Sequence, residues 1–599
     1  MILVKRMNTS MIWLASLACF CAGLYVAIDH TLDIFAYHNY VLGPIGDEGT
    51  DAANFTYPIL TGEQPFSTIF KPFADHRVVL ARIQEMFDFI YTQGIQTIQP
   101  YRLALLIWLQ AFLFITFVIV KNPPLNRSAK ILLTGTSLSL AFAGISIANY
   151  STTMMVTWPY ILVFSLLSFI ATQKYCEVLH NNDSNIKAII YLLLTFLFVT
   201  LAVLTFNIGL ILWPIVFIVL IKQNCFKKYW YLWSFALLTY PLYFLHWVPA
   251  QGKIGLHLFW KHPIQVFLYM SRVLSLPLIP TSTTTASVAT ATIALFILCF
   301  SLIFLYSLLK KKNWSTADGI LFPYFLFGFI TICIISSMRF WMTAEAANIG
   351  PRFTTPSFVI IGCLLVSLFS VNATSNKDQL YTQAMPYMIT MVWLLSWFLP
   401  NDPIAIEKTS ANQMLNVGNA NQMLISQAIV PIDEGFIEGT RNLHNLYDIN
   451  MLNYLNDVQK QYKKGVYTFW TSQYINHSID DLKFKQVRCL GQTNLSTSLD
   501  FRQHHNPGVF VNVRVNDYLP PLTRSWHILF TNANNTIIGF GLAGPAHIPL
   551  IDRLKNNYTP LLLFRGAINT NMLNNIPTVT TWAADNQSKQ ICKLGSINV

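Results

Sequence analysis

Apolar runs of membrane-spanning length alternate with short polar segments over the first two thirds of the chain. A helix needs roughly 17 to 25 predominantly apolar residues to cross the hydrocarbon core of a bilayer. Such runs occupy residues 11–28, 102–120, 131–150, 154–172, 188–206, 207–222, 229–247, 287–307, 319–337, 356–373 and 383–399. The pattern predicts an α-helical polytopic membrane protein with about eleven transmembrane helices.

The overall composition agrees with this prediction. Of the 599 residues, 53% are hydrophobic and 11% are charged, and the mean hydropathy is +0.44. Soluble domains carry about 25% charged residues. A net charge of +12 would suit a nucleic-acid partner, but the lysines and arginines lie mainly in short clusters between the apolar runs. The charge therefore indicates membrane topology and no nucleic-acid partner.

The positive charges also predict the orientation. Cytoplasmic loops carry an excess of lysine and arginine, and alternate loops here hold fourteen against eight of them. Lys5 and Arg6 belong to the richer set, which predicts a cytoplasmic N-terminus. The first apolar run exceeds the about 7 to 15 residues of a signal-peptide core, so we expect an uncleaved anchor. With an odd number of spans, the chain after about residue 400 lies outside the cytoplasm.

Two of the predicted outer loops, residues 29–101 and 248–286, are far longer than a turn requires. Long loops gathered on one face are typical of a functional site there. Within the second loop, residues 262–280 have apolar positions at helical spacing. This spacing predicts an amphipathic helix at the membrane interface.

The sequence becomes polar and rich in asparagine after Pro400. We divide the chain into a multi-span membrane domain (1–400), a helical connector (401–465) with a helix near 443–463, and a mainly β outer domain (466–599). Short β-type runs separated by asparagine, glycine and proline turns predict strands at residues 509–515, 526–532, 536–544 and 561–568.

Two cysteines fall in this outer domain, and the other seven lie in or beside apolar segments. Cys489 and Cys592 are expected to form a disulfide if the domain is in an oxidising compartment. The other seven are expected to be ordinary residues of the membrane core: Cys19, Cys21, Cys176, Cys225, Cys299, Cys333 and Cys363.

Three carboxylates, Asp47, Glu48 and Asp51, lie within the segment GPIGDEGTDAAN of the first outer loop. The simplest interpretation is a solvated turn between glycines. The loop is, however, long enough to fold back onto the bilayer, where partial desolvation would raise the pKa of a carboxyl and make it a better base. Oxygen ligands also suit Mg²⁺ or Mn²⁺, with Asp47 and Glu48 as the candidate ligands, but three carboxylates fix neither the presence nor the identity of a metal.

The same loop contains FADHRVVLARI, residues 73–83, at the start of a helical apolar spacing. Asp75 is a candidate cap for this helix. His76 and Arg77 would then lie in its first turn, where free backbone N–H groups favour an anion such as phosphate.

A third outer segment, SMRFWMTAEAANIGPRFTTPS, carries two more candidate cations. Arg339, at the end of a span, either extends to the interface or binds substrate. Arg352 lies between Pro351 and the TTP that begins the next span. Its guanidinium would bind a phosphate through two hydrogen bonds.

The order of these features resembles that of bacterial glycosyltransferases of the GT-C type. The resemblance covers roughly residues 1–400 and rests on the acidic cluster, the DHR step, the NIGLILWP turn and PRFTTPS in that order. It implies a polyprenyl-phosphate sugar donor, used at the outer face of a bacterial inner membrane, with a first-loop acidic residue as base or metal ligand. Where the family often reads His-Asn-Glu-His-Arg, this chain reads Phe-Ala-Asp-His-Arg, so the upstream polar pair is missing.

The residues and the resemblance together predict an inverting sugar transfer to a glycan, lipid or protein acceptor. Asp47 or Glu48 would take the proton of the acceptor hydroxyl, while His76, Arg77 and Arg352, with Asp51, Asp75 and Arg339 nearby, would hold the donor phosphate.

Three alternatives stay open. An envelope polysaccharide polymerase or ligase would clamp a pyrophosphate late in the bundle. A transporter or flippase of lipid-linked sugar would place charges at the membrane midplane or show two matching halves. A structural envelope protein would use the β domain as a binding module.

Overall fold

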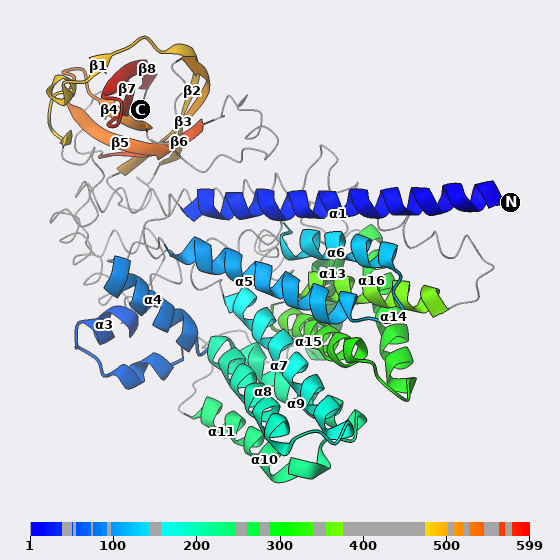
Figure 1. Ribbon diagram of the computed structural model, residues 1–599. Helices are drawn as coiled ribbons and strands as arrows, with labels where there is room; N and C mark the ends of the chain where they lie inside the picture. The colour runs from blue at the N-terminus through cyan, green and yellow to red at the C-terminus, as the bar shows by residue number, and fades with distance from the viewer. Residues whose placement is uncertain are drawn as a thin grey trace.

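The computed structural model describes a helical N-terminal region and a C-terminal β-sheet (Figure 1). The residues that it describes are 2–38, 51, 55–72, 76–92, 98–143, 157–245, 260–275, 288–339, 355–374, 474–500, 508–519, 526–543, 562–569 and 578–598. The predicted span at 383–399 and the predicted helix at 443–463 lie outside these residues, as does the connector 401–465.

The helical region consists of long helices and shorter helical turns. Its longer elements are α1 (Ile2–His38), α4 (Val79–Thr92), α5 (Gln99–Phe114), η3 (Ile115–Val120), α6 (Arg127–Ala141), α7 (Thr157–His180), α8 (Asn185–Thr205), α9 (Leu212–Lys222), α13 (Pro263–Ser275), α14 (Val288–Lys310), α15 (Thr316–Arg339) and α16 (Thr355–Thr374). Shorter helical turns are α3 (Tyr57–Leu60), η2 (Phe66–Phe70), η5 (Asn207–Ile211), η6 (Lys227–Tyr229), α10 (Trp230–Ser234), η7 (Phe235–Leu238) and α11 (Thr239–Phe244).

Six helices of the described residues are long and apolar enough to cross a membrane, or up to seven if a bent pair counts as one span. The chain is therefore a multi-pass membrane protein, as predicted. Of the other predicted spans, 207–222 and 229–247 form this bent pair, with a 120° angle between its halves. Helix α6 has 15 residues, and α16 has a shorter apolar stretch, Thr355–Ser370. The eleven-span count thus stays a prediction for these segments.

The helix ends form two groups that match the two predicted sets of loops. At one end, which we call the inner end, the Thr316 hydroxyl donates to Glu177 over 2.6 Å and Lys222 donates to the Leu309 carbonyl over 2.6 Å. At the other, outer end, Ser357 donates to the carbonyl of Val273 over 2.8 Å. Hydrogen bonds are described for several of the connections predicted to be cytoplasmic, and these connections all lie at the inner end.

Both ends of the bent pair lie at the outer end. His76 of the first long loop stacks on Phe206, just before η5, with the ring centroids 4.2 Å apart. The next residue of that loop, Arg77, donates to the carbonyl of Tyr243 in α11 over 2.7 Å. The chain therefore runs inward along η5 and α9 and turns back toward the outer end along α10 and α11, with an angle of 120° between the two halves.

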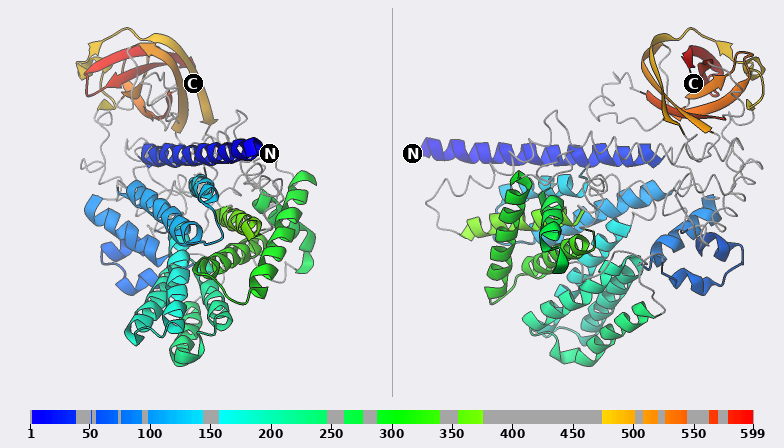
Figure 2. Two further views of the ribbon diagram at one scale, coloured as in Figure 1. Left: turned by 45° about the vertical axis from the view of Figure 1, so that its right-hand side comes forward. Right: turned by 180° about the vertical axis from the view of Figure 1, so that it is seen from behind.

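The core of the helical region is apolar and continuous from α5 to α16. Helix α1 runs along this bundle beside α6 (Figures 1 and 2). Gly23 of α1 faces Gly135 of α6, and the two backbones are so close that neither position has room for a Cβ atom. Close approach at small residues is a common way to pack helices in a bilayer, where no hydrophobic force drives them together.

The C-terminal region forms one mixed sheet of eight strands in the order β1-β8-β7-β4-β5-β6-β3-β2. Its strands are β1 (Lys485–Gln486), β2 (Leu490–Asp500), β3 (Gly508–Leu519), β4 (Trp526–Thr531), β5 (Ile537–Ala543), β6 (Leu562–Asn569), β7 (Thr578–Asp585) and β8 (Gln590–Asn598). All neighbours are antiparallel except β1 and β8, and the sheet curls strongly (Figure 1). The four predicted strands are confirmed as β3, β4, β5 and β6.

The predicted disulfide between Cys489 and Cys592 is present, with Cα atoms 5.5 Å apart, and the seven other cysteines are free. It joins the residue before β2 to β8, across a sequence separation of 103 residues. Disulfides persist in oxidising compartments. The bond is thus consistent with an extracytoplasmic location of this domain.

Replacing both Cys489 and Cys592 by serine is expected to lower the unfolding free energy of the sheet domain by about 2 to 5 kcal/mol, because the open chain of the unfolded state regains its freedom. Denaturant unfolding of the full-length protein, followed by the fluorescence of Trp526 and Trp582 above the tryptophan background, measures this loss. Cys299→Ser, which removes an exposed free thiol, is the control. Equal midpoints with and without the disulfide would contradict the prediction.

Candidate functional site

The predicted site residues fall into three groups. Asp47, Glu48, Asp75 and Arg352 lie outside the described residues, so their prediction is untested. Arg339 is the last residue of α15, and only its backbone is described. The remaining three, Asp51, His76 and Arg77, lie together at the outer end, around the start of α4.

Asp51 forms an ion pair with Arg82 of α4, and both side chains are fully buried. Nε and Nη2 of the guanidinium donate to the carboxylate over 2.6 to 3.1 Å, and Nη1 donates to the carbonyl of Ile69 over 2.8 Å and to that of Lys71. Burial raises the pKa of the Asp51 carboxyl, and the hydrogen bonds and charge of Arg82 act in the opposite direction. This pair anchors the loop to the helix, and the sequence analysis did not assign Arg82 to the site.

Arg77 occupies a different position from the predicted one. Helix α4 begins at Val79, so His76 and Arg77 precede the helix and do not form its first turn. The Arg77 guanidinium donates to the carbonyls of Tyr243, Phe70 and Leu245, and its backbone N–H donates to the Tyr243 hydroxyl over 3.2 Å. Arg77 therefore ties the first outer loop to the end of α11, and a phosphate at its guanidinium would have to displace these carbonyls.

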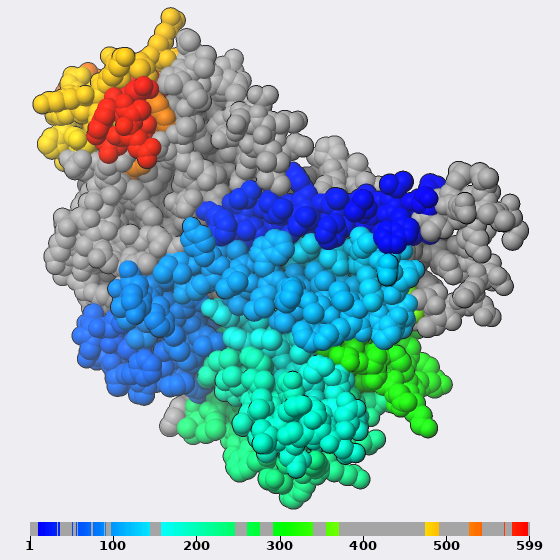
Figure 3. Space-filling view, in the orientation of Figure 1, coloured from blue at the N-terminus to red at the C-terminus, as the bar shows by residue number. Residues whose placement is uncertain are grey.

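Helix α4 is present as its apolar spacing predicted, but its polar side faces the protein. The buried stripe consists of Ala81, Gln84, Glu85 and Asp88, at the spacing of one helical face. On the opposite side, Phe87 and Tyr91 stack with 5.7 Å between ring centroids and are exposed. Residues 55–72 and 76–92 lie at the surface of the helical region (Figure 3). In water, the apolar stripe of a surface helix would face the protein and its polar stripe the solvent. The reverse arrangement seen in α4 is favourable where the outward side contacts lipid.

The buried stripe of α4 makes two further side-chain contacts. Asp88 forms an ion pair with Arg102 of α5, with Nη2 2.7 Å from the carboxylate, and Glu85 accepts a hydrogen bond from the Thr56 hydroxyl over 2.8 Å. Burial raises the pKa of the Asp88 carboxyl, and Arg102 opposes this shift. A carboxyl with a raised pKa is a stronger base once ionised, which is the property predicted for Asp47 and Glu48.

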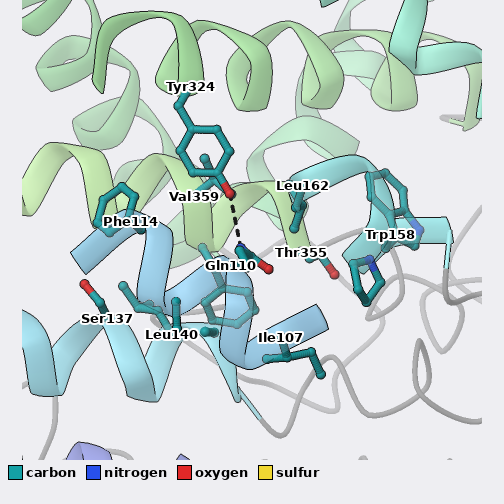
Figure 4. A pocket seen from close by; sticks show the side chains of 15 residues that line it. Ile107, Gln110, Phe114, Ser137, Leu140, Trp158, Leu162, Tyr324, Thr355 and Val359 are labelled. Carbon is teal, nitrogen blue, oxygen red and sulfur yellow. Dashed lines mark hydrogen bonds between the residues drawn. The ribbon is translucent and has the colours of Figure 1, made fainter. Parts of the chain in front are cut away.

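A pocket lies between α5, α6, α7, α15 and α16 (Figure 4), and α5, which lines it from Ile107 onward, also carries Arg102. Its lining is mainly apolar and reaches from Trp158 and Thr355, at the outer ends of α7 and α16, to a hydrogen bond of 3.1 Å between Gln110 and Tyr324. Gln110 lies about 16 Å along α5 from Gln99, so the pocket extends to mid-span. Trp158 also packs on Phe206, 5.7 Å between centroids, and thereby connects the pocket to His76.

The described residues do not assemble a metal centre. Among them, no group of three or more histidine, cysteine, aspartate or glutamate side chains is arranged to hold a metal ion. Asp51, which belongs to the acidic cluster considered for Mg²⁺ or Mn²⁺, is paired with Arg82. No step is therefore assigned to a metal.

Buried carboxylates and cations next to an apolar pocket suit an amphiphile, with a polar head at the outer end and an apolar chain within the bundle. Glu85, Asp88 and Arg102 were missed by the sequence analysis. The signal that would have found them is the polar stripe at three- and four-residue spacing, opposite the apolar stripe, within an outer loop.

Comparison with known proteins does not assign the chain to a family. No protein-family model matches the chain, and no curated protein or solved structure matches it. The fold defines a multi-pass membrane protein with a disulfide-bonded C-terminal sheet. The resemblance to GT-C glycosyltransferases stays a hypothesis drawn from the sequence.

Proposed function

We propose that the protein is a GT-C type membrane glycosyltransferase of a bacterial inner membrane. It would transfer a sugar from a polyprenyl-phosphate donor to a glycan, lipid or protein acceptor on the outer face, from an eleven-span domain with a periplasmic C-terminal sheet. The single observation that carries the proposal is the buried, carboxylate-bearing face of α4 at the outer end, joined through the Asp88–Arg102 ion pair to α5, which lines a mainly apolar pocket.

The reaction requires a base and a counter-charge. A carboxylate takes the proton of the acceptor hydroxyl, whose oxygen bonds to the anomeric carbon while the bond from that carbon to the phosphate oxygen breaks. Asp47 or Glu48 remains the predicted base, and among the described carboxylates with a raised pKa, Asp88 lies on the buried face of α4. Polyprenyl phosphate leaves with the bonding electrons and needs cations to stabilise its charge. One displacement inverts the anomeric centre.

The test is turnover by the purified full-length protein in lipid nanodiscs with a labelled polyprenyl-phosphate hexose. Asp47→Asn and Glu48→Gln are each expected to reduce release of polyprenyl phosphate by about 10²- to 10⁴-fold if that residue is the base. Glu63→Gln, in the same loop and exposed, is the matched control. Full activity in both Asp47→Asn and Glu48→Gln would remove these residues from the mechanism.

The same preparation separates the alternatives. Turnover only of a pyrophosphate-linked oligosaccharide would indicate a polymerase or ligase. Movement of labelled donor between leaflets without release of polyprenyl phosphate would indicate a flippase. Either result would replace the proposed function.

A further inference from the structure

Two glutamine side chains near the Asp88–Arg102 ion pair have no hydrogen-bond partner in the part of the chain that the structure describes. Gln84 of α4 is 4% exposed and Gln99 of α5 is fully buried, and in each case both the amide nitrogen and the amide oxygen are unpartnered. A buried amide without a partner costs roughly 1 to 3 kcal/mol. Most buried polar groups in proteins are satisfied, so two such amides in one cluster indicate that something polar binds there.

The two carboxamides flank one ion pair. Gln84 lies four residues before Asp88 on α4, and Gln99 lies three residues before Arg102 on α5. Residues at these spacings are neighbours on one helix face. Since Asp88 and Arg102 are in contact, both carboxamides lie within one helical turn of the same pair.

The same place has unused hydrogen-bond donors. Nε of Arg102 is buried and has no acceptor among the described residues, whereas the guanidinium groups of Arg77 and Arg82 donate to protein oxygens. Helix α5 begins here without a side-chain cap, and Pro100 in its first turn contributes no N–H of its own. The first amides of a helix have no partner within the helix and favour an anion.

We propose that Gln84, Gln99 and Arg102 form the site for the phosphate and hydroxyl groups of a lipid-linked polyol head group. Arg102 and the start of α5 bind the phosphate, and the two carboxamides, each able to donate and to accept, bind adjacent hydroxyls. The assignment of the sugar phosphate as ligand rests on the proposed function. In this proposal the main phosphate ligand is Arg102 and not Arg77, because the guanidinium of Arg77 donates to backbone carbonyls.

The experiment uses the full-length protein in phosphatidylcholine nanodiscs and measures binding and thermal stability together. The probes are a polyprenyl-phosphate hexose and phosphatidylglycerol, which is a phosphodiester with free hydroxyls. Gln84→Met and Gln99→Met keep the side-chain volume and remove the amide. Arg102→Lys keeps the charge beside Asp88 and removes Nε and the planar fork.

Each of the three variants is expected to bind the polyprenyl-phosphate hexose at least tenfold more weakly. The two methionine variants are also expected to melt at the same or a higher temperature, because they remove unpartnered buried amides. Gln173→Met at the inner end is the matched control, since Gln173 is equally buried but accepts a hydrogen bond from Gln223 over 2.7 Å. It should lower the melting temperature and leave binding unchanged.

The other outcomes are distinguishable. Wild-type affinity in all three variants would overturn the site and leave the proposed function standing. Melting temperatures of Gln84→Met and Gln99→Met that fall as in Gln173→Met would show the amides to be structural, which also overturns it. Binding of phosphatidylglycerol but not of the polyprenyl-phosphate hexose, weakened by the same variants, would support the site and overturn the proposed function.

Discussion

Replacing Arg82 by leucine is expected to destabilise the protein by about 3 to 5 kcal/mol, the usual cost of removing one partner of a buried ion pair. The substitution leaves the Asp51 carboxylate, which is fully buried, without its counter-charge. It also leaves the carbonyls of Ile69 and Lys71 without the Nη1 donor. Thermal unfolding of the purified protein in one detergent at pH 8 measures the effect.

The deficit of Arg82→Leu should become smaller as the pH falls from 8 to 5. Burial raises the pKa of Asp51 in the folded protein, and the variant lacks the group that opposes this shift. A carboxyl whose folded pKa lies above its unfolded value binds the proton more tightly when folded, so low pH favours the folded variant. Stability is then lost as the pH rises through the folded pKa.

Two further variants control this prediction. Asp51→Leu combined with Arg82→Leu should recover much of the loss, because no charge remains buried. Lys187→Ala breaks the ion pair with Asp183, which is exposed, and should leave the midpoint unchanged. A wild-type midpoint for Arg82→Leu alone at pH 8 would mean that the pair does not hold the loop.

Gly135→Val should separate α1 from α6 and cost about 3 kcal/mol or more, at the upper end of the range for overpacked cores. A Cβ at Gly135 would lie well inside van der Waals contact distance of the backbone of Cys19 and Phe20, and a backbone cannot rotate away as a side chain does. The two helices therefore have to move apart. Gly362→Ala is the control, since its Cβ would lie 3.5 Å from Leu140 Cδ1, in ordinary contact.

Thiol labelling measures the separation directly. Cys19 is 4% exposed and packs in the core, so it should become reactive toward a membrane-permeant maleimide only when α1 has left α6. The assay requires a background in which the accessible thiols of Cys21, Cys299 and Cys333 are replaced by serine. An unreactive Cys19 in Gly135→Val would show that the helices tolerate the larger side chain.

The sequence predicted best where one physical requirement dominates. Spans such as α7 and α15 have to be long and apolar, and strands such as β4 have to alternate apolar with polar residues or be apolar throughout. The local sequence pattern therefore located them. Strand β2, LGQTNLSTSLD, was missed because its residues are mostly polar and small, and its place at the end of the sheet comes from pairing with β3. Tertiary pairing of that kind has no local signal.

The arginines of the first outer loop also show that local sequence does not reveal tertiary contacts. Arg77 and Arg82 are equally basic in the sequence, and nothing local reveals that one donates to three carbonyls and the other to a buried aspartate. The sequence analysis assigned phosphate binding to Arg77 from its predicted place in the first turn of a helix. Only the fold distinguishes them from Arg102, whose Nε has no acceptor among the described residues.

The contacts of Arg77 also determine when the first outer loop can be completed during biosynthesis. Its acceptors Tyr243 and Leu245 lie 166 and 168 residues further along the chain. Because the ribosome delivers the N-terminal part first, the loop has to wait outside the membrane, without the contacts of Arg77 to α11, until the bent pair has been inserted. Premature release of a chain that ends before α11 would therefore leave an unfinished outer loop, which quality-control proteases could recognise.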